Sequence, residues 1–507
     1  MRWKKQKTRF CQTLGHPKSG QAVAETLGKQ LDNAYRETIR GLEENTALLL
    51  HPANSSRNFA ISSLDELEEP DSLTQLRREV SARLPRIDLP EVLLEINALT
   101  GFADEFTHIS EQNARADGLT ISLCAALIAQ ACNIGLSPVI DPSFPPLMRH
   151  RLSWVMQNYF RPETLIRSNA RLVDWQSTVP LAHQWGGGEV ASADGMRFVV
   201  PVQSLHSKPN KKYFGRGRGV TYYNFTSDQF TGFHQIVIPG TLRDSMYILQ
   251  GLLEQETSLN VTEIMSDTAG TSEVVFGLFW LLGYQFSPRL ADIGKARFWR
   301  CDPKADYGAL NSLSRNCVKP AQFIQHWDDI LRTAASLRMG TVSASELIQS
   351  LFNSNAPTAL GKAIAELGKI PKTIYMLNYI GDDNYRRRIL TQLNRGESRH
   401  SLAREMYHGK KGELRQSYRE GQEEQLGALG LVVNALVLWN TIYMQAAIDQ
   451  LQAEGYDVRP EDKARLSPLI HEHCNFMGKH SFRLDGLPPS GTLRPLRQPQ
   501  KLELMAA

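Results

Sequence analysis

Two acidic residues stand where a carboxylate could reach a bound cation. Asp267 closes the short apolar run at 263–267 and is followed at once by Thr-Ala-Gly. Asp194 is two, four and six residues before the apolar Met196, Phe198 and Val200. On a strand, its side chain would therefore project from the same face as theirs. Carboxylates on neighbouring strands can hold Mg²⁺ for phosphoryl transfer. The alternative is that Asp267 caps the next helix and Asp194 starts a turn with Gly195.

A third carboxylate usually completes such a site, and the basic stretch 386–419 offers a candidate. It contains ten Lys or Arg residues against the three acids Glu397, Glu405 and Glu413, a local net charge of +7. The neighbours of Glu397 at i+3, i+4 and i+7 are all polar, so they form no core stripe on a helix. Glu397 is therefore either an ion-pair partner or a metal ligand beside a nucleic acid.

A second basic stretch, 206–227, has five Lys or Arg residues and no acid. Cations that neutralise phosphates, next to rings that stack on bases, suit a nucleic-acid groove. Glycines at 215, 217 and 219 would permit close approach of the backbone to phosphate. The alternative is a solvated basic loop with its rings in a hairpin core. The aromatic residues concerned are Tyr213, Phe214, Tyr222, Tyr223 and Phe225.

The elements that would position these residues form a predicted α/β layer at 185–290. Glycines break a helical pattern near 185, and β-prone or helical periodicities then alternate. We expect helical structure before this layer, after an acidic linker at 65–71, and again after it from about 300 to 455. The predicted elements of the layer are a strand ending near 200, a hairpin at 219–240, a helix at 241–256, a strand ending at 267, a helix at 272–283 and a strand at 284–290.

Composition limits the class of protein. The chain has 507 residues, 42% of them hydrophobic, which as a prior suggests roughly three domains. A net charge of +4 is too small to establish a polyanionic partner, so the uneven distribution of charge matters more. Six scattered cysteines without a Cys-x-x-Cys pair indicate a reducing, intracellular environment. The apolar stretch 426–439 is short of the ~20 residues that span a bilayer and predicts a buried helix.

Three other classes of site fit the residues less well. A tyrosine recombinase needs a His-x-x-Arg box, but His400 and Arg404 are one residue too far apart, which argues against Tyr407 as a nucleophile. A related exonuclease needs an acid two residues after the first, where this chain has Met196. A zinc site in the stretch 471–480 would lack any familiar spacing.

Several ordered motifs together resemble the replicative class II transposases, the Tn-three-type family. The resemblance runs from about residue 85 to 498. It implies an α/β ribonuclease-H-like catalytic core with a helical insertion, flanked by mostly α-helical regions. The motifs are SADG at 192–195, RDS at 243–245, SDTAG at 266–270, LNRGESRHSLAR at 393–404 and QLGALGLVVNALVLWNT at 425–441.

The resemblance also implies an activity. Asp194, Asp267 and Glu397 would be the catalytic Asp-Asp-Glu triad and the ligands of two Mg²⁺ ions, for which Mn²⁺ substitutes. The spacings are 73 and 130 residues, and a helical insertion would fill the longer one. The enzyme would hydrolyse each transposon end to free a 3′-hydroxyl, which then attacks target DNA. Implied partners are terminal inverted repeats, target DNA and a second copy of the chain, in the bacterial cytoplasm near the nucleoid and without a membrane.

The expected division of the chain has six parts. They are an N-terminal helical segment and linker at 1–72, a helical scaffold at 73–184, the first part of the core at 185–299, a helical insertion at 300–385, the closing helices at 386–455 and a C-terminal extension at 456–507. The expected DNA-contacting residues are Lys211, Lys212, Arg216, Arg218, Arg243, Arg395, Arg399, His400, Arg404, Lys410, Lys411 and Arg415.

Length is where the chain departs from the family pattern. Members are usually about twice as long, with DNA-binding and dimerisation regions ahead of the catalytic half. This leaves a second hypothesis open, a non-catalytic DNA-binding or inhibitory remnant. A DNA-cleavage assay distinguishes the two.

Overall fold

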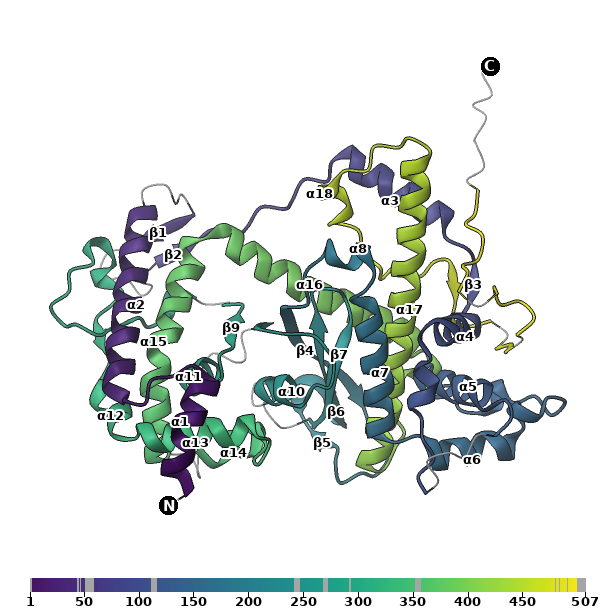
Figure 1. Cartoon of the computed structure of the whole chain (residues 1–507), viewed down its shortest axis with the longest axis horizontal. Coiled ribbons are helices and arrows are strands. Elements are labelled where there is room, and N and C mark those ends of the chain that lie inside the picture. The colour runs from purple at the N-terminus through teal and green to yellow at the C-terminus, as the bar shows by residue number, and fades with distance from the viewer. Residues whose placement is uncertain are drawn as a thin grey trace.

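A central sheet lies between two helical lobes in the computed structural model (Figure 1). One lobe is built around α15 (Ala359–Gly381) and α2 (Gly20–Gly41), and the other around α17 (Arg419–Ala453). Helix α16 (Asp383–Met406) runs between the two lobes, across the sheet. The structure describes residues 2–42, 45, 47–50, 59–110, 116–240, 247–267, 272–290, 293–351, 357–478, 480–482, 484–489 and 491–498.

Six strands form the sheet. Antiparallel strands β4, β6 and β7 are followed across the sheet by β8 and β9, which run parallel to β4. A short strand, β5, shares the outer edge of β6 with β7. The bounds are β4 (Val190–Val199), β5 (Lys208–Pro209), β6 (Arg218–Ser227), β7 (Gly232–Pro239), β8 (Glu263–Ser266) and β9 (Gln285–Pro288). The predicted strands and hairpin are therefore confirmed.

Alternation along the strands gives the sheet two buried faces. Even-numbered residues of β4 and β6, such as Met196 and Tyr222, join a core with α17 (Arg419–Ala453). Odd-numbered residues, such as Ala193 and Phe225, join a second core on the opposite face. That second face is covered by α10 (Ile248–Glu254) and α11 (Glu273–Leu281). Residues 241–246, the predicted start of the helix before β8, lie outside the described residues.

Helix α17 is the longest element, with 35 residues. The apolar stretch 426–439 forms its middle, and the prediction of a buried helix is confirmed. Polar turns at both ends continue the same helix, which length and composition alone would allow to cross a membrane. Because 94% of its apolar window is buried inside the protein, α17 is a core helix.

The lobe around α17 is helical, as predicted for residues 73–180. Helices α4, α5 and α7 pack directly on α17, and α6 packs on α5. Residues 62–70, which include most of the predicted linker, form no helix or strand. The remaining elements of this lobe are α3 (Asp71–Arg83), β3 (Ile87–Asp88), α4 (Leu89–Thr100), α5 (Leu119–Ala131), α6 (Arg149–Tyr159), α7 (Pro162–Gln176), α8 (Pro180–His183), α18 (Pro460–Lys463) and β12 (Cys474–Asn475).

The other lobe packs on α11 through α15. Gly277 and Gly368 allow this contact, since a Cβ at Gly368 would lie 2.8 Å from the Gly277 nitrogen and still closer to the Glu273 carbonyl. N-terminal helices join the same lobe, α2 on α15 and α1 on α13. Its elements are α1 (Arg2–Leu14), α2 (Gly20–Gly41), β1 (Leu48–Leu50), β2 (Phe59–Ile61), β10 (Trp299–Arg300), β11 (Asn316–Cys317), α12 (Pro320–Gln325), α13 (Trp327–Arg338), α14 (Ala344–Leu351) and α15 (Ala359–Gly381).

The buried side chain of His234 predicts that the stability of this fold depends on pH. His234 on β7 is 7% exposed, and neither ring nitrogen has a hydrogen-bond partner. Burial lowers its pKa to about 4, although the Glu254 carboxylate lies 4.0 Å away. Below pH 6.5 the unfolded chain binds the proton and the folded chain does not, so stability falls as pH drops from about 6.5 towards 4. The loss approaches about 3 kcal/mol.

We expect His234→Phe to flatten this acid dependence in urea unfolding between pH 7 and pH 4.5. His473, whose pKa burial also lowers to about 4, stays in the variant, so part of the dependence remains. His183→Phe, at an exposed position, is the control. Identical pH profiles for wild type and His234→Phe would contradict the assignment.

Candidate active site and nucleic-acid interface

Asp194 lies on β4 and Asp267 directly follows the adjacent parallel strand β8, at matching positions in the register. The pairing of β4 with β8 ends at Ala193 opposite Ser266, and the two acids are the next residues along each strand. Adjacent strands lie about 4.8 Å apart. The two backbones therefore bring both carboxylates to the same edge, where Asp267 is exposed directly after β8. Residues 268–271 lie outside the described residues.

Helix α16 (Asp383–Met406) carries Glu397 to β4. The close contact is at Gly396, where a Cβ would lie 3.2 Å from the Ser192 hydroxyl oxygen. That hydroxyl donates a hydrogen bond to the Gln392 carbonyl at 3.3 Å. Ser192 is two residues before Asp194, so this packing places Glu397 beside the strand that carries the first acid.

His400, one turn after Glu397, contacts the first acid directly. Its Nδ1 lies 3.5 Å from Asp194 Oδ2, and its ring is buried, with Nε2 lacking a hydrogen-bond partner. Burial by itself raises the pKa of Asp194, but the His400 ring and the Gly195 N–H, which donates at 2.7 Å, hold it below the ordinary value. Asp194 is therefore ionised at neutral pH while its side chain remains 39% exposed.

The opposite side of α16 faces solvent. Glu397, Ser398, Ser401 and Arg404 are all exposed. Among the described residues Glu397 forms no ion pair, which removes the simplest structural role suggested by its basic surroundings.

Three carboxylates offer oxygen atoms, the donors that Mg²⁺ prefers. The donor chemistry of Asp194, Asp267 and Glu397 therefore fits a divalent cation. Within the described part of the chain, however, no three His, Cys, Asp or Glu side chains lie close enough to hold a metal ion as they stand. Among the described residues the three acids therefore form no closed ligand cluster, and the link of Glu397 to the strand of Asp194 is the packing of Gly396 on Ser192.

Three of the expected DNA contacts, Arg395, Arg399 and His400, are partly or fully buried, which corrects the sequence-based expectation. Arg399 is 3% exposed and donates to Asn434 Oδ1 at 2.6 Å on α17, and burial lowers its pKa to about 10. Arg395 donates to the carbonyl oxygens of Trp185 and Asp228 at 3.2 and 2.7 Å. Both guanidinium groups lie on the side of α16 that packs against the protein, and their hydrogen bonds hold the helix to its neighbours. His400, which is 4% exposed, is likewise an interior residue.

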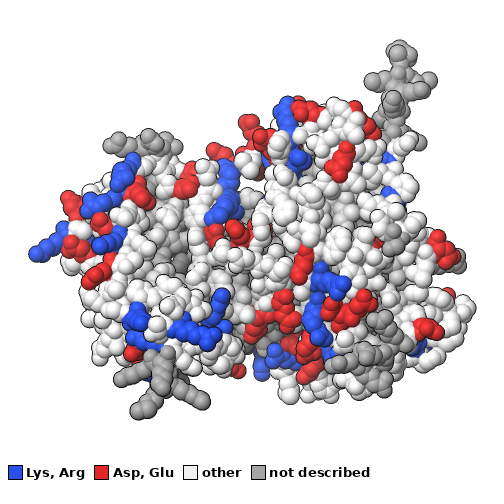
Figure 2. All heavy atoms as spheres, in the orientation of Figure 1, with Lys and Arg blue, Asp and Glu red and all other residues white. Residues whose placement is uncertain are grey.

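The other expected DNA contacts lie at the surface, with one exception. Arg243 falls outside the described residues. Arg415 is exposed and paired with Glu413 at 2.8 Å. The exposed cations without an ion pair to any described acid are Lys211, Lys212, Arg216, Arg218, Arg404, Lys410 and Lys411. Figure 2 shows Lys and Arg intermingled with Asp and Glu over the face seen there, so the charge pattern of that view does not by itself mark a groove.

The aromatic residues of 206–227 mostly belong to the core, which favours the second of the two interpretations left open for this stretch. Phe214, Tyr222, Tyr223 and Phe225 are all buried. Tyr213 is 44% exposed, with the Arg197 guanidinium 4.4 Å from its ring centre. Gly219 serves packing, because a Cβ there would lie 2.3 Å from the Phe198 carbonyl oxygen. The alternative stated for this stretch, a basic loop with rings in the hairpin core, describes it better.

The structure adds residues that the sequence did not single out. Asn434 Nδ2 donates to Asn169 Oδ1 and to the Gly232 carbonyl at 2.7 and 2.8 Å, which joins α17 to α7 and β7. A lone Asn inside the apolar stretch 426–439 was the available signal. Tyr407 is 2% exposed, consistent with the argument against it as a nucleophile.

Comparison with known proteins gives a consistent result. Residues 91–480 match the family model described as the Tn3 transposase DDE domain. The chain is 55% identical over 494 residues to the transposase for transposon gamma-delta of Escherichia coli K12, covering 97% of the chain and 49% of the relative. It is 43% identical to the transposase for Tn4556 of Streptomyces fradiae, covering 98% of the chain and 55% of the relative. The chain thus spans about half the length of the curated relatives it matches.

Proposed function

Because this chain belongs to the Tn3 family of transposases, we propose that it is the catalytic part of a DNA transposase, which cleaves transposon 3′ ends and joins them to target DNA. The observation that supports this most is the placement of Asp194 on β4 and Asp267 directly after β8, at matching positions in the register. The packing of Gly396 on Ser192, which brings Glu397 to the same strand, adds to it.

The core of this enzyme would be ribonuclease-H-like. Support comes from the strand order, in which three antiparallel strands are followed by two that run parallel to the first, with helices on both faces. Helices α12 to α15 stand between β9 and α16, where the resemblance implies an insertion. The divisions at 72, 184, 299, 385 and 455 remain our proposal for the domain limits.

Asp194, Asp267 and Glu397 would hold two Mg²⁺ ions, or Mn²⁺ in their place. When bound, these cations stabilise the charge that develops on the phosphate oxygens. Asp194 is already ionised because His400 and the Gly195 N–H favour its charged form. Exposure of Asp267 and Glu397 leaves room for a phosphodiester at this edge.

The proposed reaction has two displacements at phosphorus. Water attacks the phosphodiester at each transposon end, and the 3′ oxygen leaves as a free hydroxyl. That hydroxyl then attacks a target phosphodiester in line, and the target's 3′ oxygen leaves, with no covalent link to the enzyme. Terminal inverted repeats and target DNA would be the substrates in replicative transposition, and a homodimer would pair two ends near the nucleoid.

The decisive experiment incubates the chain with supercoiled plasmid carrying transposon ends, in Mg²⁺, Mn²⁺ or EDTA. We expect nicks at the 3′ ends and joined products only with the divalent ions. DNA binding without metal-dependent nicking would favour the non-catalytic remnant instead.

The exposed cations around α9 (Lys211–Phe214) give a separate prediction. Charge reversal of Lys211, Lys212, Arg216 and Arg218 together should weaken DNA binding and flatten its salt dependence. Each lost phosphate contact lowers the slope of log K against log salt by about 0.9. Filter binding across a salt series measures the slope. Reversal of four exposed lysines in the other lobe, Lys29, Lys304, Lys319 and Lys362, is the matched control. An unchanged slope would show that the four cations around α9 are solvated surface residues that do not contact DNA.

A further inference from the structure

The turn that follows α16 holds two lysines in an unusual backbone conformation. Lys410 and Lys411 have φ values of 46° and 60°, and Gly412 follows at 71°. Lysine seldom adopts this left-handed region, which glycine and asparagine tolerate. Both lysines are exposed, so burial does not explain the conformation. Strained backbone of this kind persists only where surrounding contacts impose it, and it concentrates at functional sites.

The contacts that impose this conformation come from Asn133. Its side-chain amide donates hydrogen bonds to the carbonyl oxygens of Gly409 and Glu413, both at 2.9 Å, and so brackets the two lysines. Asn133 is 1% exposed, and its Oδ1 accepts a hydrogen bond from Gln425 Nε2 at 2.8 Å. A backbone hydrogen bond holds the start of the turn to the same segment, since the Gly409 N–H donates to the Cys132 carbonyl at 2.9 Å.

The same turn joins two of the elements that carry the candidate acids, α16 and β4. It begins where α16 ends, after Met406, and the Leu414 N–H then donates to the Val199 carbonyl at 2.9 Å, at the end of β4. Its position relative to the candidate active site is therefore fixed at both ends.

A row of exposed polar residues leads from Glu397 to this turn. Ser401 and Arg404 follow Glu397 at i+4 and i+7, on the same exposed side of α16. At 1.5 Å per residue, the end of α16 lies about 14 Å beyond Glu397. One DNA strand carries a phosphate about every 3.4 Å along the helix axis. For a DNA duplex whose axis runs along α16, the lysine turn would lie about four or five nucleotides from a phosphate held at the acids.

The charges around the turn leave the two lysines unpaired. Glu413 pairs with Arg415 at 2.8 Å, and Glu405 pairs with His471 at 2.5 Å. Neither these two acids nor any other acid in the described ranges forms an ion pair with Lys410 or Lys411. The two charges are thus available to a phosphate.

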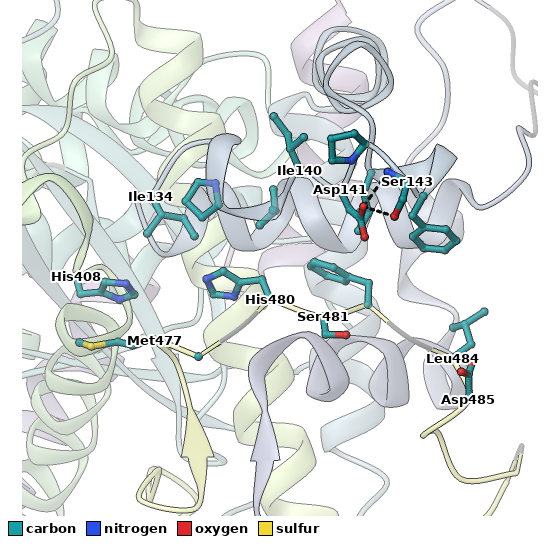
Figure 3. A pocket seen from close by; sticks show the side chains of 17 residues that line it. Ile134, Ile140, Asp141, Ser143, His408, Met477, His480, Ser481, Leu484 and Asp485 are labelled. Atoms are coloured by element: carbon teal, nitrogen blue, oxygen red, sulfur yellow. Dashed lines mark hydrogen bonds between the residues drawn. The ribbon is translucent and has the colours of Figure 1, made fainter.

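A groove of about 1260 Å³ beside the turn does not continue the same surface. Figure 3 shows the His408 and His480 rings at one end and Asp141 and Asp485 towards the other. Those two carboxylates would repel phosphates, and much of the lining contributed by the other described residues is apolar.

We propose that the Lys410–Lys411 turn is a preformed contact for the DNA backbone, placed by Asn133 about four or five nucleotides from the cleaved bond. This inference rests on the proposed function. Asn133 acts as a positioning residue, because its amide shapes the turn without reaching DNA.

The test variant is Lys410→Asn/Lys411→Asn, which removes both charges and puts asparagine where left-handed backbone is tolerated. We expect unchanged or higher thermal stability together with weaker binding to duplex DNA in EDTA. The salt slope should fall by about 1.8, so that the loss of affinity between 50 and 200 mM salt becomes about tenfold smaller. Phosphate-ethylation interference should lose its signal four or five nucleotides from the cleaved bond. The control is Lys304→Asn/Lys362→Asn, which makes the same change in charge at exposed positions. It should keep the wild-type salt slope and the wild-type interference signal.

Asn133→Gly separates charge from geometry. It keeps both lysines and allows left-handed backbone at 133, but it removes both bracketing hydrogen bonds. We expect severalfold weaker binding and a blurred interference signal, with the melt showing that the chain folds. A slope and an interference pattern equal to wild type in the double lysine variant would overturn the inference, even if the wild-type chain cleaves DNA. A wild-type chain that binds but never cuts would defeat the proposed function, while the salt slope would still decide whether the turn contacts phosphate.

Discussion

Asp194→Ala, Asp267→Ala and Glu397→Ala are each expected to reduce DNA nicking and joining by about 10³-fold or more, the scale of losses seen when an essential catalytic group is removed. Each variant loses one carboxylate that would hold a cation. All three side chains are at least partly exposed, so alanine leaves no buried cavity and the fold should persist. DNA binding in EDTA should be retained or slightly improved, because a negative charge facing phosphate is gone.

The matched control for these variants is Glu405→Ala. Glu405 is an exposed acid on the same helix, two turns after Glu397, and its carboxylate pairs with His471. Nicking by Glu405→Ala should stay near wild type in the plasmid assay. An active Glu397→Ala alongside an inactive Glu405→Ala would show that the third acid had been misplaced by two turns of α16.

The strands and the first two acids could be predicted because they rest on local patterns. Alternating residues in β4 and β6 bury both faces of the sheet, and that periodicity is visible in the sequence. Asp267 was identifiable because it ends an apolar run that is too short for a helix. The parallel register that places Asp194 beside Asp267 was not visible, since it depends on pairing across 73 residues.

The directions of the basic side chains of α16 could not be predicted from the sequence. Composition gave a local charge of +7 but not the direction of each side chain. Arg395 and Arg399 lie four residues apart, on the side of the helix that packs on the turn after β6 and on α17. Their partners are backbone carbonyls and an asparagine, which no acid in the sequence would have signalled. Asn133 escaped notice for the same reason, because its function comes from a loop about 280 residues away.

We expect the C-terminal stretch around Arg494 to contribute to the stability of the fold, because an ion pair with the buried Glu95 holds it in place. Glu95 on α4 is 4% exposed and accepts hydrogen bonds from Trp439 Nε1 at 2.8 Å and Tyr443 OH at 3.1 Å. Arg494 is its cationic partner, through Nε, and also donates to Glu91 at 2.9 Å. Residues 456–507 are expected to form a C-terminal extension, and this contact ties its described part at Arg494 to the core of the lobe around α17.

We expect Arg494→Ala to lower the free energy of unfolding by about 3–5 kcal/mol, because it strands the Glu95 charge in the interior without a cation. Urea unfolding measures the loss. Arg497→Ala is the control, since that side chain is exposed and the backbone N–H that bonds the Arg83 carbonyl remains in the variant. Glu95→Gln in the Arg494→Ala background should restore much of the stability, because a neutral amide oxygen still accepts from Trp439 and Tyr443. If Arg494→Ala is no less stable than Arg497→Ala, Glu95 has another means of neutralisation, and the C-terminal stretch is not held at this point.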